Sequence, residues 1–411
     1  MTVIEGFKLA IEKWCSIALL CIAIMANGCA AATAAQGLVK DENGTLTMAI
    51  DIGTVRINPD VQRLLSEQYT SMLIDTVTEV ASLVREHFPQ FTDQLTITIR
   101  TTQQDLDHVG GVIGIAQSPE SVDIDIAASF SEELAAPIQQ SLKVTLLHEL
   151  HHIERGWTIE NNRFGPGIMI AAVNEGLAIV FAEQVSGIKQ PHLSYPDSVD
   201  KWVEEILALP VNAPYETWMM GTHPDGRQYI GYRTGKFIVE QALRSGGETI
   251  ESLTEKGNYE ILFQTGLIDT NPLALSKVGD DFATSNQPGK AIQAYTKAVS
   301  YAEPALQTKI EQRIDLLTHP VTLSDTEMNE LAGQYHSDRM DIKVSRDKSG
   351  LYVQLPGKPK FTLYPTDKTH FVILEADVSF EFVMDEHDAV ATLLFNTPGG
   401  THRFTPIVPA M

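Results

Sequence analysis

Apolar residues recur with two different periods in the first part of the chain. Residues 45–57 and 95–100 alternate apolar with polar residues, and residues 121–126 do so again after a glycine-rich stretch, so we expect three strands. Residues 60–88 repeat apolar residues every three or four positions, which predicts one long helix. The mixture predicts an α+β domain over residues 40–265. Further helices are expected over 131–155, 168–185, 199–208 and 228–245.

Two later segments have their own patterns. Residues 272–304 match the length of one tetratricopeptide (TPR) unit, so a TPR-like helical hairpin is expected within 270–318. Because a single unit cannot bury a solenoid core, an ordinary helical hairpin that links two domains is the alternative. Residues 320–411 contain short alternating runs between turn residues, which predicts a small all-β barrel or sandwich. The runs are 340–344, 350–355, 361–364, 370–374, 378–384 and 390–395.

The composition is typical of a folded globular protein. Of 411 residues, 43% are hydrophobic and 20% are charged, which excludes wholesale disorder and a multi-span membrane protein. The 30 Lys and Arg against 53 Asp and Glu give a formal net charge of −23, which argues against nucleic-acid binding. Cys15, Cys21 and Cys29 are the only cysteines, so a disulfide framework or a Cys-ligated metal is excluded from the chain beyond them.

The first segment, residues 1–35, has the pattern of a targeting device. A charged start, an apolar run over 14–25 and a small-residue exit predict a signal peptide and export. Ala26–Cys29 resembles a bacterial lipobox, in which the cysteine becomes lipidated; cleavage after Ala34 and a retained anchor are the alternatives. We therefore expect a protein of the bacterial cell envelope, periplasmic or an outer-membrane lipoprotein, or a secreted one, that meets a membrane only through this lipid or anchor.

The clearest chemical motif lies in residues 144–152, which read VTLLHELHH and contain H-E-x-x-H. On a helix, His148 and His152 are four residues apart and project from one face. Two neutral imidazoles at that spacing can hold Zn²⁺. Glu149 then lies beside the metal without ligating it, where it can accept a proton from the attacking water. His148 and His152 are therefore the predicted ligands, and Glu149 the predicted general base.

A catalytic zinc site needs a third protein ligand as well as an open position. Glu175, in the segment NEGLA on the next predicted helix, follows His152 by 23 residues, which leaves room for a loop and a returning helix. Its small apolar neighbours favour a partly buried carboxylate, whose charge a metal would balance. One Zn²⁺ per chain is expected on His148, His152 and Glu175. His151 is expected on the helix flank, as an outer group or on the substrate side.

A tetrahedral oxyanion would need a hydrogen-bond donor besides the metal. The segment 221–235, GTHPDGRQYIGYRTG, offers four candidates: His223, Tyr229, Tyr232 and Arg233. Tyr232 and His223 are preferred as catalytic residues. The alternative is that Tyr232 is only a packed aromatic ring and His223 only a loop histidine, without a catalytic role.

These motifs resemble a bacterial family of predicted zinc-dependent proteases of unknown physiological role. That family pairs an H-E-x-x-H helix with a downstream E-G-L-A helix, as residues 143–187 do here. It also carries a G-x-x-G turn and strand before the first helix, here Val109–Gly114 with Val122–Ile126, and a G-Y-x-x-G helix after the second, here Gly231–Gly235. The resemblance covers residues 60–250.

The resemblance implies the zincin-type fold of gluzincin peptidases. It implies the same ligands, His148, His152 and Glu175, and the same base, Glu149. In that fold the edge strand of a sheet pairs with an extended substrate. The strand over 121–126 is expected to be that edge.

The C-terminal region, residues 320–411, is similar to a small lipocalin-like β domain. The similarity rests on Glu330–Tyr335, which contains G-x-Y, on the run Leu351–Pro356, and on Phe380–Phe382. Such domains are appended to penicillin-binding-protein-like hydrolases and to helical-repeat proteins of bacterial envelopes. We expect a binding or packing module, because the region carries no catalytic constellation.

The expected function is that of an exported zinc metallopeptidase that hydrolyses peptide bonds of a peptide or protein substrate. The alternative is a non-catalytic cell-envelope binding protein, in which a structural or degenerate zinc domain presents the C-terminal modules to a protein partner. Zinc-dependent hydrolysis of a non-peptide bond is a third interpretation. The intact Glu149 favours an enzyme, because a degenerate site would be expected to lose it.

Overall fold

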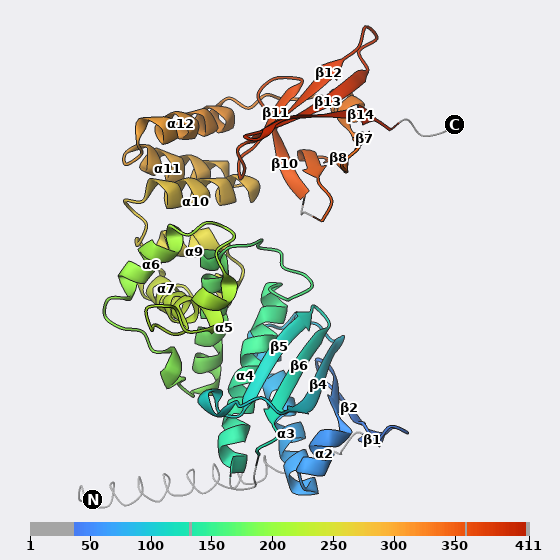
Figure 1. The fold of residues 1–411 in the computed structure, drawn as a ribbon, viewed down its shortest axis with the longest axis vertical. Coiled ribbons are helices and arrows are strands. Elements are labelled where there is room, and N and C mark those ends of the chain that lie inside the picture. Colours follow the sequence, from blue (N-terminus) through green and yellow to red (C-terminus); the bar gives the residue numbers. More distant parts are fainter. Residues whose placement is uncertain (1–36, 131–133, 358–359, 408–411) are drawn as a thin grey trace, which may run out of the picture. The chain divides into compact units, whose positions relative to one another are not determined.

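The computed structural model describes residues 37–130, 134–357 and 360–407 (Figure 1). Contacts along the chain divide it into two compact units. The first unit runs to Arg85 and adds residues 90–115 and 120–142; the second takes 86–89, 116–119 and everything from Lys143 onward. The predicted signal over 1–35 and its three cysteines lie outside the described residues. The domain boundaries expected from the sequence stay predictions.

A six-stranded mixed sheet forms the core of the first unit. Its strand order is β1-β2-β3-β4-β6-β5. Strand β3 pairs with β4 and β4 with β6 in parallel, whereas β1, β2 and β3 are antiparallel neighbours. The strands are β1 (Val39–Lys40), β2 (Leu46–Ile50), β3 (Gly53–Ile57), β4 (Leu95–Thr102), β5 (Val112–Ser118) and β6 (Ser121–Ala127).

The single strand expected over 45–57 is a hairpin. The chain turns at Asp51 and Ile52, and Gly53 continues it with a φ of 140°. A Cβ on Gly53 would lie 1.9 Å from the carbonyl oxygen of Leu95 on the parallel neighbour. A side chain at this position would therefore prevent β3 from approaching β4.

The expectation that residues 121–126 form the sheet edge is wrong. They form β6, which lies between β4 and β5, and the edge is β5. The glycine-rich sequence of β5 conceals it, because only a short part of that strand alternates apolar with polar residues.

The long helix expected over 60–88 is two helices, α2 (Pro59–Leu64) and α3 (Glu67–His87). Leu65 is extended, with φ −113° and ψ 141°, and interrupts the helical path. Asp60 on α2 accepts hydrogen bonds from the backbone and hydroxyl of Thr101 on β4, at 2.8 and 2.6 Å. Apolar periodicity continues across the break because both helices bury their apolar residues.

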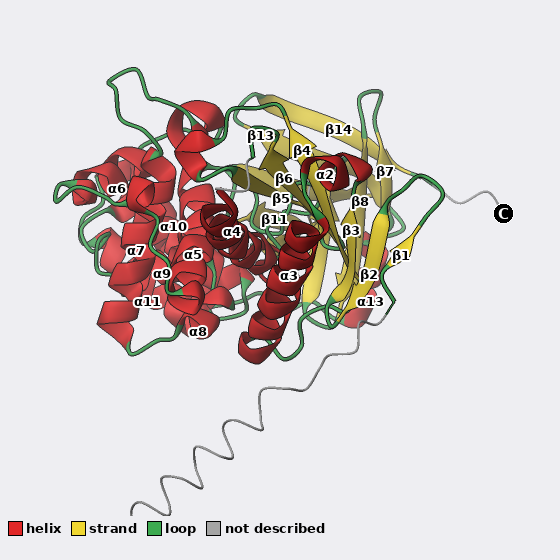
Figure 2. Ribbon diagram, turned by 90° about the horizontal axis from the view of Figure 1, so that it is seen from below, coloured by secondary structure: helices red, strands yellow, loops and turns green. Residues whose placement is uncertain are grey.

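Four of the expected helices are confirmed: α4 (Ala135–Arg155), α5 (Ile168–Ser186), α6 (Val199–Leu207) and α7 (Ile230–Gly246). Two short helices, α8 (Ile250–Thr254) and α9 (Asn258–Gln264), were not predicted. The second unit also holds a 3-10 turn, Pro191–Leu193, and a π-helical turn, Glu216–Met220. Helices α5, α7 and α9 pack together as one group (Figure 2).

Helix α5 is apolar on all sides. Its length and hydropathy would suffice to cross a membrane, but 83% of the apolar window is buried inside the protein. Burial inside the protein explains why this helix is hydrophobic on all sides. Helix α5 is therefore a buried helix of the second unit.

Helices α5 and α7 cross at two glycines, which belong to the E-G-L-A and G-Y-x-x-G motifs. A Cβ on Gly235 would lie 1.7 Å from the carbonyl oxygen of Ala172, and one on Gly176 would lie 2.2 Å from the carbonyl carbon of Gly235. Two backbones can approach this closely only where neither residue has a side chain. The glycines of both motifs thus set the distance between the two helices.

Three helices follow α9: α10 (Pro272–Thr284), α11 (Pro288–Val299) and α12 (Pro304–Thr318). The segment in which a helical hairpin was expected thus contains three helices, of which α10 and α11 pack on each other. Tyr295 of α11 packs on Gly279 of α10, where a Cβ would lie 2.3 Å from the tyrosine ring. Its hydroxyl donates to Asp280 at 2.6 Å. The TPR likeness stays a prediction.

The C-terminal region is a closed eight-stranded antiparallel barrel with the order β10-β11-β12-β13-β14-β7-β8-β9. Of the two predicted forms, barrel and sandwich, the barrel is confirmed. Helix α13 (Asp325–Leu331) and the strands β7 and β14 were not predicted, and the lipocalin likeness stays a prediction. The strands are β7 (Gly333–His336), β8 (Asp341–Asp347), β9 (Gly350–Gln354), β10 (Lys360–Pro365), β11 (His370–Ile373), β12 (Val378–Met384), β13 (Val390–Thr397) and β14 (Gly400–Pro406).

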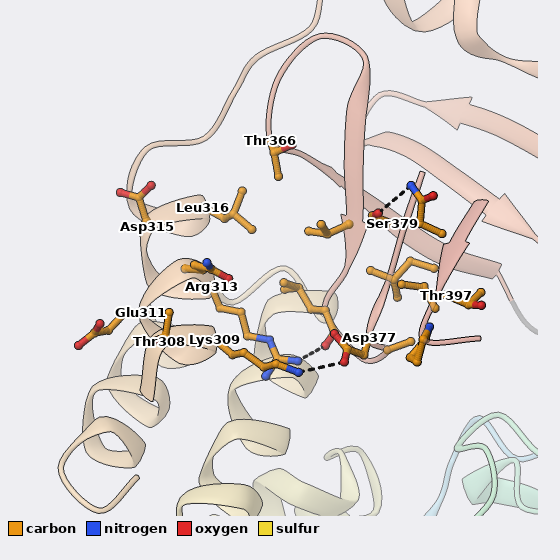
Figure 3. A pocket seen from close by; sticks show the side chains of 18 of the residues that line it. Thr308, Lys309, Glu311, Arg313, Asp315, Leu316, Thr366, Asp377, Ser379 and Thr397 are labelled. Atoms are coloured by element: carbon orange, nitrogen blue, oxygen red, sulfur yellow. Dashed lines mark hydrogen bonds and ion pairs between the residues drawn. The ribbon is translucent and has the colours of Figure 1, made fainter. Parts of the chain in front are cut away.

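A cleft of about 1000 Å³ is lined by α12 and by barrel residues from β11 to β13 (Figure 3). Lys309 of α12 pairs with Asp377 at 2.9 Å, and Arg313 of the same helix donates to the carbonyl oxygen of Leu374. The lining mixes apolar residues with charged ones of both signs. None of the residues of the predicted metal site lines this cleft.

The crossing of α5 and α7 can be tested with Gly235→Ala. The new methyl group meets backbone atoms, which cannot move aside, so we expect the free energy of unfolding to fall by about 1–3 kcal/mol or more. The measurement is the urea midpoint at 25 °C. Gly289→Ala on α11 is the matched control, because nothing lies within 4 Å of a Cβ there. That variant should gain about 0.5–1 kcal/mol from helix propensity. An unchanged midpoint for Gly235→Ala would contradict the close crossing.

Candidate metal centre

Helices α4 and α5 bring the three predicted ligands together. His148 and His152 lie one turn apart on α4, with their Nε2 atoms 3.0 Å from each other. Oε2 of Glu175, from α5, lies 3.0 Å from Nε2 of His148 and 3.2 Å from Nε2 of His152. His152 and Glu175 are buried, and His148 is partly exposed. The group therefore opens to solvent on the His148 side.

The three donor atoms fit a tetrahedral zinc ion. With Zn–N and Zn–O distances of about 2.0–2.1 Å, donor atoms in a tetrahedral site lie about 3.3 Å apart. The distances of 3.0, 3.0 and 3.2 Å need only a slight expansion to reach this value. Two imidazole nitrogens and one carboxylate oxygen form a donor set that zinc prefers in catalytic sites. These residues can hold a metal ion.

The electrostatics of the cluster favour the binding of a cation. Burial alone would raise the pKa of Glu175, but the two histidines lower it well below its usual value. Burial likewise opposes protonation of His148, yet Glu175 and Glu149 together raise its pKa. In the described chain the ion-pair partners of Glu175 are these two imidazoles, with no Lys or Arg. A buried carboxylate with only weak counter-charges is stabilised by a bound metal ion.

Glu149 lies beside the cluster and is held by the edge strand. Its Oε2 accepts a hydrogen bond from the backbone N–H of Ala116 on β5 at 2.8 Å. The residue is 7% exposed, so the carboxylate has little contact with bulk water. The hydrogen bond fixes its orientation, and the sequence does not reveal this partner.

The outer side of β5 is partly covered at this point. The carbonyl oxygens of Ala116 and Gln117 accept hydrogen bonds from the N–H groups of Ile159 and Glu160, at 3.1 and 3.0 Å. The loop after α4 therefore pairs with β5 next to the residue that orients Glu149. Ile159 itself is 71% exposed.

Tyr232, one of the two predicted oxyanion donors, lies close to the cluster. It is on the first turn of α7, partly buried. Burial raises its pKa well above the usual value, and the nearby charges of Glu175 and Glu149 raise it further. The phenol is thus a neutral hydrogen-bond donor at neutral pH.

The other candidates have different partners. His223 pairs with Asp225 at 2.9 Å and its ring lies 4.7 Å from that of Trp218. Tyr229 has a φ of 52° and lies edge-on to Tyr232, with ring centroids 6.4 Å apart. Arg233 donates to the carbonyl oxygens of Ser194 and Gln228. The catalytic role of His223 stays a prediction, and the contacts of this residue are those of a loop histidine.

Sequence reasoning missed Tyr215. Its phenol lies close enough to Glu175 and Glu149 to feel their charges, while 41% of the residue is exposed. Burial of the hydroxyl raises its pKa, as do the charges of Glu175 and Glu149. The surrounding sequence, NAPYETW, has no motif and no period, so nothing in it distinguishes this tyrosine from a loop residue.

The expectation for His151 is wrong. It is fully buried, and its Nε2 lies 2.9 Å from Oγ1 of Thr254. Its ring packs against Phe88 and Phe181. Successive residues of an α-helix are about 100° apart around its axis. His151, one position before His152, therefore points away from the cluster and into the core.

Arg155, also missed, connects α4 with α5 and with the α8–α9 region. It is fully buried and donates to Oδ1 of Asn174, the residue before Glu175, at 2.8 Å. It also donates to Oδ1 of Asn258 and to the carbonyl oxygen of Lys256. Burial lowers its pKa to about 9, with Arg163 contributing. Because its partners replace water, Arg155 fixes the two ligand-bearing helices to each other.

Residues 101–262 match the family described as Predicted Zn-dependent protease (DUF2268). The match includes His148, Glu149, His152 and Glu175, and also Tyr215 and Tyr232. It leaves out the first strands of the sheet, the helices from α10 onward and the barrel. No curated protein matches the chain.

Metal binding can be tested by the zinc content of the purified chain. We expect about one zinc per chain, and a rise in the thermal midpoint on zinc addition, worth about 2.7 kcal/mol when free zinc is 100 times Kd. Glu175→Gln should lose most of the bound zinc. The matched control is Glu183→Gln on the same buried helix, whose carboxylate pairs with Lys236 at 2.7 Å instead. Equal zinc loss in both variants would count against Glu175 as a ligand.

Proposed function

We propose that the protein is an exported zinc-dependent metallopeptidase. The convergence of His148, His152 and Glu175, with Glu149 beside them, is the observation that supports this function most strongly. The matching family is named for predicted zinc-dependent proteolysis, which points to a hydrolase. Export rests on the signal-like pattern of residues 1–35 alone.

His148, His152 and Glu175 would hold one Zn²⁺, which when bound polarises a carbonyl group and makes water more acidic. Glu149 accepts a proton from the attacking water as the new C–O bond forms. Since its Oε2 is engaged by the N–H of Ala116, we assign the proton to Oε1. Glu149 then donates this proton to the leaving nitrogen as the C–N bond breaks, which leaves a free amine and a carboxylic acid that ionises at neutral pH.

Tyr232 is the proposed donor to the oxyanion. Its phenol is neutral, is near both Glu149 and Glu175, and sits on a helix whose distance from α5 is set by two glycines. A preorganised donor in a site with little water stabilises developing negative charge strongly. His223 is the second candidate for this role, with support from sequence alone.

A peptide or protein is the proposed substrate. Four exposed large apolar residues lie in the two loops of the second unit that supply contacts to the site. Ile159 pairs with Ala116, and Tyr215 is close enough to Glu175 for the carboxylate charge to raise the pKa of its phenol. The others, Val211 and Met220, are 64% and 59% exposed. Exposed apolar side chains next to a catalytic group favour substrates with apolar residues near the cleaved bond.

A second candidate function is that of a non-catalytic envelope protein that binds a partner through its C-terminal modules. The cleft between α12 and the barrel favours it, because its volume is large enough for a ligand and its lining combines apolar and charged groups. The two functions are compatible within one chain. An intact Glu149 with an ordered partner favours the enzyme as the principal function.

Glu149→Gln tests the proposed base. The amide keeps the size and can still contact Ala116, but it cannot accept the proton, so kcat on a fluorogenic peptide library should fall about 10²–10⁴-fold. Zinc content should stay at one per chain. Glu154→Gln, the same change later on α4, is the control and should keep full activity. Full activity in Glu149→Gln would refute the assignment.

A further inference from the structure

The loop after α4 bonds to the edge strand at the residue that orients the proposed base. In an extended strand, the N–H and C=O of one residue point to the same side. The N–H of Ala116 donates to Glu149 at 2.8 Å, and its carbonyl oxygen accepts from the N–H of Ile159 at 3.1 Å. Both groups by which Ala116 could pair with an added strand are therefore already bonded within the chain.

The same loop, a hairpin over residues 157–162, also bonds to β5 beyond Ala116. The N–H of Glu160 donates to the carbonyl oxygen of Gln117 at 3.0 Å, and β5 ends one residue later, at Ser118. An edge strand pairs with an extended peptide through N–H and C=O groups that have no partner yet. The hairpin therefore restricts such pairing to the part of β5 that precedes Ala116.

The hairpin is fixed to the metal-binding helix at its base. The N–H of Trp157 donates to the carbonyl oxygen of His152 at 2.9 Å, and Trp157 forms an antiparallel bridge with Asn162. Within the hairpin, the hydroxyl of Thr158 donates to the carbonyl oxygen of Asn161 at 3.1 Å and accepts from the N–H of Asn161 at 3.2 Å. These bonds hold the hairpin in a defined position relative to the metal ligand.

The place of the hairpin on β5 determines which side of a bound peptide it limits. Antiparallel pairing is the more stable arrangement per residue, so we expect an extended substrate to run opposite to β5. The N-terminal part of that substrate then lies toward the C-terminal end of β5, where the hairpin is bonded. The residues that follow the cleaved bond lie toward the start of the strand, away from the hairpin.

We propose that the hairpin over residues 157–162 closes the N-terminal side of the substrate-binding edge, so that the protein removes short segments from the N-termini of peptides. This inference rests on the proposed metallopeptidase function and adds its substrate class, peptides with a short segment before the cleaved bond. The hairpin determines specificity and takes no part in the chemical step, because its bonds are to the carbonyl oxygens of β5 and not to Glu149.

The first test compares two series of fluorogenic peptides, each with one cleavable bond, on the zinc-loaded full chain. One series lengthens the segment before the bond from one residue to five, which adds about 13 Å at about 3.3 Å per residue. The other series lengthens the segment after the bond by the same amount. We expect kcat/KM to fall about tenfold or more along the first series, because the added residues must displace two hydrogen bonds of the hairpin. Along the second series it should stay level or rise.

The second test removes the tip of the hairpin. Replacing residues 158–161 by Asn-Gly leaves a two-residue turn between Trp157 and Asn162, a loop length that suits antiparallel pairs. Both N–H donors to β5 are lost, so kcat/KM for the peptide with the longest leading segment should rise about tenfold. Glu160→Ala is the matched control, because it changes an exposed side chain at the tip and keeps both backbone donors. It should discriminate between the peptides like the unaltered protein.

The outcomes separate this inference from the proposed function. Zinc content and a thermal midpoint equal to those of the unaltered protein show that the shortened chain is folded, and the peptide series on the unaltered chain decides the question without it. Equal kcat/KM along both series, or discrimination that persists in the folded Asn-Gly variant, overturns the role of the hairpin and leaves the peptidase function intact. If the unaltered chain cleaves no peptide in a way that Glu149→Gln abolishes, the proposed function itself fails.

Discussion

The buried carboxylate of Glu175 is the constraint on which the second unit depends. An ionised carboxylate away from water is costly unless a positive charge and hydrogen bonds replace the lost solvent. Here two imidazoles lie 3.0 and 3.2 Å from one oxygen. Neutral imidazoles are weak counter-charges, so a bound cation would balance the carboxylate more fully. A zinc ion satisfies all three donors at once.

The packing around the carboxylate serves that geometry. Gly176 and Gly235 let α5 approach α7 closely, and Arg155 fixes α4 to the residue before Glu175. These contacts lie in the dry interior, where close packing leaves little freedom to move. Donor atoms can therefore stay close to their bound positions. Two of the residues proposed to face the substrate, Ile159 and Val211, lie by contrast in exposed loops.

The sequence allowed most of the candidate site to be predicted, for local reasons. His148 and His152 share a helix face because 3.6 residues make one turn, and Glu149 follows from the same geometry. Glu175 could be chosen because its small apolar neighbours indicated burial. The prediction failed for His151, whose environment of Phe88, Phe181 and Thr254 comes from three separate segments. It also failed for β5, since a strand's position in a sheet depends on pairing across the chain.

The sequence by itself predicted several of the strands, the main helices, the barrel region and the metal-binding motif, because each depends on periodicity or spacing within a short segment. Only the tertiary structure decided which strand is the edge, which residue orients Glu149, and which tyrosines lie near Glu175. Ala116 has no distinctive local sequence; it orients Glu149 from 33 positions away. Such pairings arise from the packing of whole elements, and no local pattern encodes them.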